Sequence, residues 1–166
     1  MSATETLWAG TARTLDEASD ALKREEEAAV RASAAEALVR TALLLVSITE
    51  GIVANIWDAL FSEKVCDVRA EGERLGLMTE RAIAVTSGTR DLALTSQEQG
   101  YTITGLTELS EGIKRLERAR EDLARRWPRL DPEKMDQAAA RMARGEFADL
   151  SDVYHEFPEL QNPARP

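Results

Sequence analysis

The sequence predicts an all-α protein: a long antiparallel helical hairpin of the coiled-coil type or a four-helix bundle, with a short helical C-terminal appendage. Charged residues make up 31% of the chain and aromatic residues only 5%, a balance typical of long helices. The first 127 residues contain no proline, the residue that interrupts helices most strongly. We therefore predict a long-helix hairpin or bundle over residues 1–127 and a helical tail over residues 128–166. The tail holds all five prolines: Pro128, Pro132, Pro158, Pro163 and Pro166.

An apolar seam with alternating steps of three and four residues runs along the first arm. Because the seam keeps one heptad phase, we predict a single helix from Trp8 to Leu60, about 80 Å long at 1.5 Å per residue. The alternative is a break near Ser33, since Ser33 and Glu36 have the spacing of a capping box. The seam consists of Trp8, Thr11, Leu15, Ala18, Leu22, Glu25, Ala29, Ala32, Glu36, Val39, Leu43, Val46, Glu50, Val53, Trp57 and Leu60.

A second seam predicts the returning arm. It slips by one residue after Leu106, in a stretch that contains Gly88, Gly100 and Gly105, so we expect a kink or turn there. The reversal between the arms is expected near Phe61–Lys64. A thin, alanine-rich hairpin buries little surface, so we expect a homo-oligomer. The seam consists of Leu75, Met78, Ala82, Val85, Thr89, Leu92, Ser96, Gln99, Ile103 and Leu106, then Leu109, Ile113, Leu116, Arg120, Leu123 and Trp127.

The most apolar run of the chain extends from Ala42 to Trp57 and contains one acid, Glu50. A membrane span needs about 20 mostly apolar residues, and a charge at its centre costs roughly 2.5 to 3.5 kcal/mol. We therefore expect a buried core helix. A helical pore-forming or membrane-inserting protein that uses residues 42–61 is an alternative. The N-terminus has no basic region followed by an apolar stretch, so the expected location is cytoplasmic.

Glu50 and Arg120 are charged residues at positions of the mainly apolar seams. Polar groups at such positions set helix register and oligomeric state at a cost in stability. We predict this register role for both residues. A catalytic role is not expected, because the motifs of catalysis are missing around them.

The sequence contains few of the residues and motifs that are typical of catalytic or metal sites. It has one cysteine, Cys66, and one histidine, His155, and it lacks a glycine-rich phosphate loop and a nucleophile elbow. The net charge of −9 and the isoelectric point near 4.8 argue against nucleic-acid binding, which depends on Lys and Arg at phosphates. We expect a protein that is not an enzyme, with no cofactor, no metal and no nucleic-acid partner.

The sequence of the tail predicts that it forms two short helices. Asp131 is placed to cap the first, with Pro132 at its first position and Gly145 at its end, and the second should run from Leu150 to Phe157. A helix this short is marginal alone in water, so its apolar side chains need a surface. That surface is either the protein's own bundle or a groove on another protein. The candidate partner-binding residues are Phe147, Leu150, Val153, Tyr154 and Phe157.

The segment MARGEFADLSDVYHEF, Met142 to Phe157, resembles the partner-wrapping tails of small bacterial antitoxins, in which a Gly-Glu-Phe/Tyr turn precedes an acidic amphipathic helix. The resemblance implies an inhibitor that neutralises a protein partner through this tail. The leading functional expectation is a non-enzymatic helical scaffold or adaptor that acts by self-association and by binding an unidentified protein. An antitoxin- or immunity-like inhibitor is the alternative.

Overall fold

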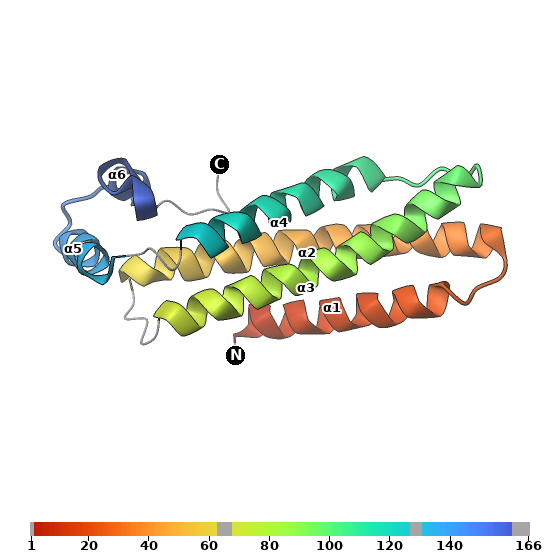
Figure 1. Ribbon diagram of the computed structural model, residues 1–166, viewed down its shortest axis with the longest axis horizontal. Coiled ribbons are helices and arrows are strands. Elements are labelled where there is room, and N and C mark those ends of the chain that lie inside the picture. The colour runs from red at the N-terminus through yellow and green to blue at the C-terminus, as the bar shows by residue number, and fades with distance from the viewer. Residues whose placement is uncertain (1, 63–67, 127–130, 161–166) are drawn as a thin grey trace.

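The computed structural model describes residues 2–62, 68–126 and 131–160. Successive long helices run antiparallel and form an elongated four-helix bundle, and the helices of the tail gather at one end (Figure 1). Within the described residues there is no strand, so the predicted all-α class is confirmed, and the bundle rather than the two-helix hairpin is formed. The helices are α1 (Ala3–Leu22), α2 (Ala28–Ser62), α3 (Val68–Glu98), α4 (Leu106–Arg126), α5 (Pro132–Ala143) and α6 (Leu150–Glu156), followed by a 3-10 turn, η2 (Pro158–Leu160).

The prediction of one helix from Trp8 to Leu60 is wrong, and so is the alternative break near Ser33. The chain reverses between Leu22 and Ala28, whereas Ser33 lies inside α2. Glu25, which fits the heptad seam, stabilises the connection instead, because its carboxylate accepts a hydrogen bond from the Glu27 N–H at 3.2 Å. Its carbonyl oxygen also accepts one from Arg31 Nη1 at 3.0 Å. The connection between α1 and α2 has a length that leaves the heptad spacing of the seam unchanged. The periodicity of the sequence therefore gives no sign of the turn.

The predicted turn in the second arm lies between α3 and α4. Helix α3 continues through Gly88 to Glu98, and the backbone then has positive φ at Gly100 (95°) and Gly105 (88°). The slip in the seam therefore marks the start of a new helix rather than a kink. Helix α2 ends at Ser62 and α3 begins at Val68, on either side of the predicted reversal. Residues 63–67, which include Lys64 and Cys66, lie outside the described residues, as do the predicted seam residue Trp127 and Pro128.

The core combines large apolar side chains with buried hydroxyls. On α3 the hydroxyls of Thr79, Thr86 and Thr89 are fully buried, and each donates a hydrogen bond to a carbonyl oxygen one turn earlier. These groups are satisfied within their own helix, so they do not require water or a ligand. The largest fully buried apolar residues are Leu15, Val39, Leu45, Val46, Val53, Leu75, Leu109, Ile113, Leu116, Val153 and Leu160.

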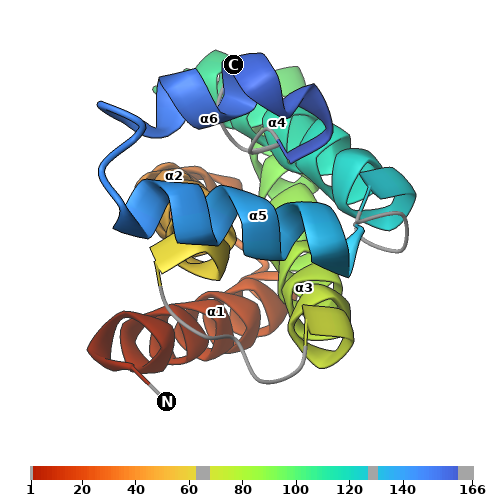
Figure 2. The ribbon, with the colours of Figure 1, turned by 90° about the vertical axis from the view of Figure 1, so that its left-hand side faces the viewer.

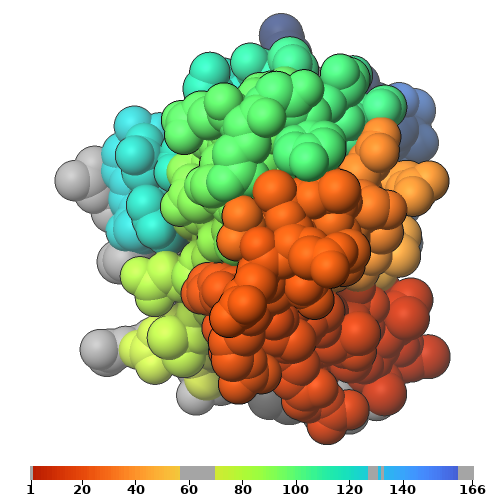
Figure 3. All heavy atoms as spheres, turned by 90° about the vertical axis from the view of Figure 1, so that its right-hand side faces the viewer, coloured from red at the N-terminus to blue at the C-terminus, as the bar shows by residue number. Residues whose placement is uncertain are grey.

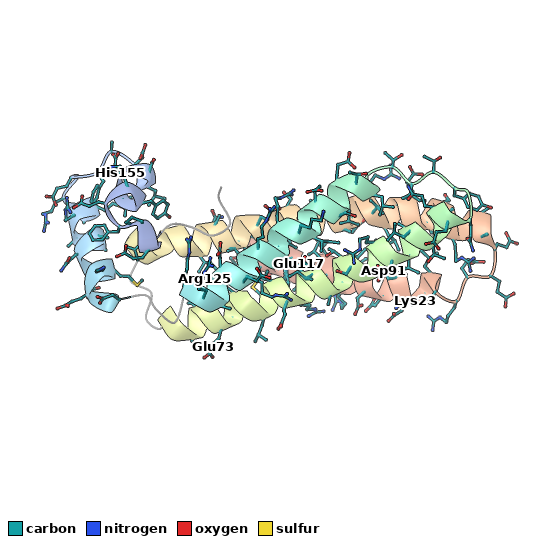
Figure 4. All side chains as sticks on the ribbon, turned by 45° about the horizontal axis from the view of Figure 1, so that its top comes forward. Lys23, Glu73, Asp91, Glu117, Arg125 and His155 are labelled. Atoms are coloured by element: carbon teal, nitrogen blue, oxygen red, sulfur yellow. The ribbon has the colours of Figure 1, made fainter. Side chains whose placement is uncertain are left out.

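Helices α2 and α3 occupy the centre of the bundle. Each of them contacts the other three long helices, and the end view shows α1 and α4 on either side of α2 (Figure 2). Charged side chains, among them those of Glu73 and Asp91, project from the outside of the bundle (Figure 4). The apolar run of α2 therefore forms part of the core on the side that faces the other helices.

By length and composition, one helix among the described residues could cross a membrane: Ala28–Ile56, within α2, whose 18-residue apolar window has a mean hydropathy of 1.8. In the bundle 44% of that window is buried. A core helix of a soluble protein passes the same test, so this property does not by itself indicate a membrane protein.

Candidate functional site

The predicted partner-binding residues of the tail lie against the protein's own bundle. Helix α5 contacts α2 and crosses its end (Figure 2). Val153 is fully buried, and it belongs to the same apolar core as the long helices. Phe147, Leu150, Tyr154 and Phe157 are half-buried and pack against that core. The five residues thus gather in one place, where they close one end of the molecule.

The caps predicted for the tail are present. Asp131 caps α5 by accepting a hydrogen bond from the Glu133 N–H at 2.9 Å, with Pro132 at the start of the helix. Gly145, with φ of 74°, follows the end of α5, and α6 ends immediately before Phe157.

Ion pairs hold the tail together internally. Arg141 of α5 contacts Glu156 of α6, and its guanidinium lies 4.7 Å from the centroid of the Phe147 ring. Lys134 pairs with Glu159 at 2.8 Å, which lowers the pKa of that carboxyl. These contacts join α5 to the segment that follows it, so the tail forms a compact structural unit.

Glu50 and Arg120, the predicted register residues, are both half-buried. Glu50 on α2 pairs with Arg115 on α4 at 3.0 Å, and this pairing raises the pKa of Arg115. The negative charge of Glu50 is therefore paired with an arginine on a neighbouring helix of the same molecule. Arg115 was missed from the sequence because it lies off the seam of α4. The register role of both residues stays a prediction.

The outward side of α2 carries a stripe that the sequence analysis missed. The residues Ala37, Thr41, Leu44, Ile48, Gly51 and Asn55 follow each other in steps of four and three, and we call this stripe the α2 outer face. Leu44 is 52% exposed, Ala37, Gly51 and Asn55 are exposed, and Thr41 and Ile48 are half-buried. The inner seam dominated the periodicity, which is why a second stripe on the same helix was overlooked.

The α2 outer face contains no charged residue. The acids of this part of α2 lie toward α4: Glu50 pairs with Arg115, and Glu36 accepts the backbone N–H of Thr104 at 3.2 Å. Arg40 is exposed, and it flanks the stripe on the same side of the helix, three residues after Ala37 and four before Leu44. The six residues of the stripe are uncharged and extend over about 27 Å of helix, at 1.5 Å per residue.

A second feature lies at the opposite end from the tail. A hollow of about 260 Å³ opens where the end of α1 and the start of α2 meet the end of α3. Figure 3 looks onto this end of the bundle, where the α1–α2 connection lies beside the α3–α4 turn. The hollow is lined by Leu22, Lys23, Arg31, Leu92, Thr95, Ser96 and Gln99.

The described part of the chain contains no group of three or more His, Cys, Asp or Glu side chains that could hold a metal ion. His155 lies in α6, at the far end of the molecule from Lys23 (Figure 4). Cys66 is outside the described residues.

The chain matches no protein-family model, no curated protein and no solved structure. Its function is therefore inferred from its own surfaces, among them the α2 outer face.

Proposed function

We propose that this protein is a non-enzymatic helical scaffold or adaptor that self-associates through the α2 outer face and binds a further protein as an assembly. The single observation that carries the proposal is an uncharged stripe, with exposed Leu44 at its middle, on the surface of a strongly charged chain.

Electrostatics favours a second copy as the occupant of this face. The chain has 30 acidic and 21 basic residues, so two copies repel each other at most orientations. The α2 outer face carries no acid, and the nearest glutamates, Glu36 and Glu50, are engaged by α4 or by the turn before it. Two copies can therefore approach here without burying like charges.

The sizes of the side chains also suit pairing of α2 with itself. Along the stripe the order is small, small, large, large, small, small: Ala37, Thr41, Leu44, Ile48, Gly51 and Asn55. In an antiparallel pair related by a two-fold axis, Leu44 of one copy meets Ile48 of the other, and Thr41 meets Gly51. A Cβ added at Gly51 would touch nothing within 4 Å, so that position is open to a partner.

The inhibitor and membrane alternatives are less well supported. An inhibitor that acts through its tail must release Val153 from a fully buried position. An inserting helix must bring the Glu50–Arg115 pair into the bilayer or break it. Self-association requires neither change.

The test is the molar mass in solution, measured by size-exclusion chromatography with light scattering at micromolar concentrations. The native protein is expected to show a dimer that dissociates on dilution, and Leu44→Glu should give a monomer with an unchanged helical circular dichroism spectrum. Leu77→Glu is the matched control, because Leu77 is 67% exposed on α3 but stands among Glu73, Arg74, Glu80 and Arg81. A strictly monomeric native protein, or equal effects of the two substitutions, would refute the proposal.

A further inference from the structure

Arg40 carries a positive charge at the α2 outer face that the molecule itself does not pair. Its side chain is exposed, and it forms no ion pair with any of the described residues, including Glu36 one turn earlier on α2. Glu36 instead accepts the backbone N–H of Thr104. An unpaired arginine that is moved out of water into an interface costs free energy unless an acid meets it. The proposed self-association is therefore favoured by an orientation that brings an acid of the second copy to Arg40.

Glu50 supplies a carboxylate with room for a second arginine. Its Oε1 accepts a hydrogen bond from Nη2 of Arg115 at 3.0 Å. Among the described residues, its Oε2 accepts only from Nε of Arg115, at 3.3 Å. An ionised carboxylate has about four acceptor positions, so this oxygen is not saturated. The Glu50 side chain is also 25% exposed, which leaves it within reach of a partner.

Arg40 and Glu50 lie on the same edge of the α2 outer face, the edge toward α4. At about 100° per residue, Arg40 and Glu50 are displaced from Leu44 in one direction around the helix, by about 40° and 120°. Ile48 and Thr41 are displaced in the other direction, by about 40° and 60°. A two-fold axis between antiparallel helices brings the same edge of both copies together. Arg40 of one copy therefore faces the edge of the other copy that carries Glu50.

The register along the helices brings the two residues to one level. When Leu44 of one copy meets Ile48 of the other, Glu50 of the second copy lies two positions from Arg40 of the first, about 3 Å along the axis. We infer that the two copies associate with their α2 helices antiparallel, and that Arg40 of each copy pairs with Glu50 of the other. The inference rests on the proposed self-association and names the residues that fix its orientation.

The parallel orientation lacks this complementarity. It places the two Arg40 side chains at one level and the two Glu50 side chains at another, so like charges face each other and oppose association. The antiparallel orientation separates the two Arg40 residues by 12 positions, about 18 Å along the axis. That distance exceeds the Debye length of about 8 Å at physiological salt, so their repulsion is largely screened. Each Glu50 then contacts Arg115 of its own copy and Arg40 of the other, which gives its predicted register role a physical basis.

Disulfide formation tests the orientation. Ala37→Cys and Asn55→Cys, each combined with Cys66→Ser, are oxidised in air at a concentration at which the native protein dimerises, and the products are identified by intact mass. A disulfide requires Cα atoms within about 7 Å. In the antiparallel pair Ala37 meets Asn55, so the mixture of the two variants should give the mixed disulfide. Either variant alone should give little product, because equivalent positions lie about 27 Å apart along the axis.

A double-mutant cycle on the dissociation constant of the dimer tests the ion pair. Arg40→Gln should raise this constant about 2- to 30-fold, because the dimer contains two such pairs and each partly exposed pair contributes modestly. In the Glu50→Gln background the same substitution should have no further effect. Arg81→Gln, which removes an exposed arginine of α3, is the matched control and should change the constant less than about twofold. An unchanged helical circular dichroism spectrum shows that each variant is folded.

The possible failures are distinguishable. A dimer in which Ala37→Cys forms a disulfide with itself would overturn the antiparallel orientation and leave the proposed self-association intact. Equal effects of Arg40→Gln in the native and the Glu50→Gln backgrounds would overturn the ion pair between the copies. A native protein that stays monomeric at micromolar concentrations would refute both the inference and the proposed function.

Discussion

Individual hydrogen bonds and charges fix how the helices of this bundle meet. The indole Nε1 of Trp8 donates to the hydroxyl of Thr49 at 2.9 Å, and both residues are buried. The same hydroxyl donates to the Leu45 carbonyl oxygen at 2.7 Å. Thr49 therefore satisfies a donor on α1 while it remains part of α2, which couples the two helices at one level of the bundle.

Thr49→Val should lower the free energy of unfolding by about 1 to 3 kcal/mol, because it leaves the Trp8 indole N–H buried without an acceptor. The measurement is urea denaturation followed by circular dichroism. Thr49→Ser is the control, since it retains the hydroxyl and should recover most of the stability. A loss in Thr49→Ser without a loss in Thr49→Val would show that the methyl group, and not the hydrogen bond, matters at this position.

At the scale of single helices, caps and glycines decide where each element begins and how closely it packs. Helix α1 starts with a capping box in which the Ser2 hydroxyl accepts the Glu5 N–H and the Glu5 carboxylate accepts the Ser2 N–H. Glu5 also contacts Arg74 of α3. The backbone N–H of Ser2 and the Arg74 guanidinium together lower the pKa of Glu5 from 4.5 to about 2.

This pKa predicts an acid-sensitive contribution to stability. Because the folded pKa of Glu5 lies below its ordinary value of 4.5, the stabilisation is complete above that pH and is lost as the pH falls toward about 2. The stability difference between native protein and Glu5→Gln should therefore be larger at pH 6 than at pH 2.5, measured by urea denaturation. Exposed Glu17→Gln should give a difference that changes little over this range.

Two helical glycines allow the effect of helix propensity on stability to be distinguished from the effect of side-chain packing. Gly88 in α3 has nothing within 4 Å of an added Cβ, so Gly88→Ala should stabilise the protein by up to about 1 kcal/mol. At Gly112 in α4 the added Cβ would lie 3.1 Å from Cγ1 of Val46, a buried and stiff β-branched side chain. Gly112→Ala should therefore lack this gain and melt at a lower temperature than Gly88→Ala. The reverse order would mean that α4 moves freely away from α2.

At the scale of the whole molecule, the C-terminal tail completes the core. Met135 and Ala138 of α5, Val153 of α6 and Leu160 of η2 belong to the same buried apolar cluster as the four long helices. Lys134–Glu159 and Arg141–Glu156 pairs connect the parts of the tail, but ion pairs this exposed to water contribute little to stability. Burial rather than charge therefore holds the tail in place.

Leu160→Ala should lower the free energy of unfolding by about 2 to 5 kcal/mol, because Leu160 is fully buried. Leu77→Ala is the control with the same chemistry at a site that is 67% exposed, and it should stay within about 0.5 kcal/mol of the native protein. Thermal melting measures both. Equal stability of Leu160→Ala and the native protein would mean that the tail leaves the bundle in solution.

The helical class, the turn near Gly100 and Gly105 and the caps of the tail could be predicted, because they depend on local chemistry. Gly100 and Gly105 adopt backbone angles that favour glycine, and Asp131 with Pro132 forms a local cap. The turn after Leu22 could not be predicted from periodicity, because the connection preserves the heptad phase. The hollow at Arg31 was also missed, since it requires three helix ends to meet.

The sequence by itself determined the helical periodicity, the proline-free first part and the apolar character of α2, because these follow from the order of side chains along one helix. Only the tertiary structure decided which side of α2 is covered. Leu44 and Leu45 are adjacent and equally apolar, yet Leu44 is 52% exposed and Leu45 is fully buried. The physical reason is that burial depends on which neighbouring helices pack on each side, and that packing is set by contacts between residues far apart in the chain.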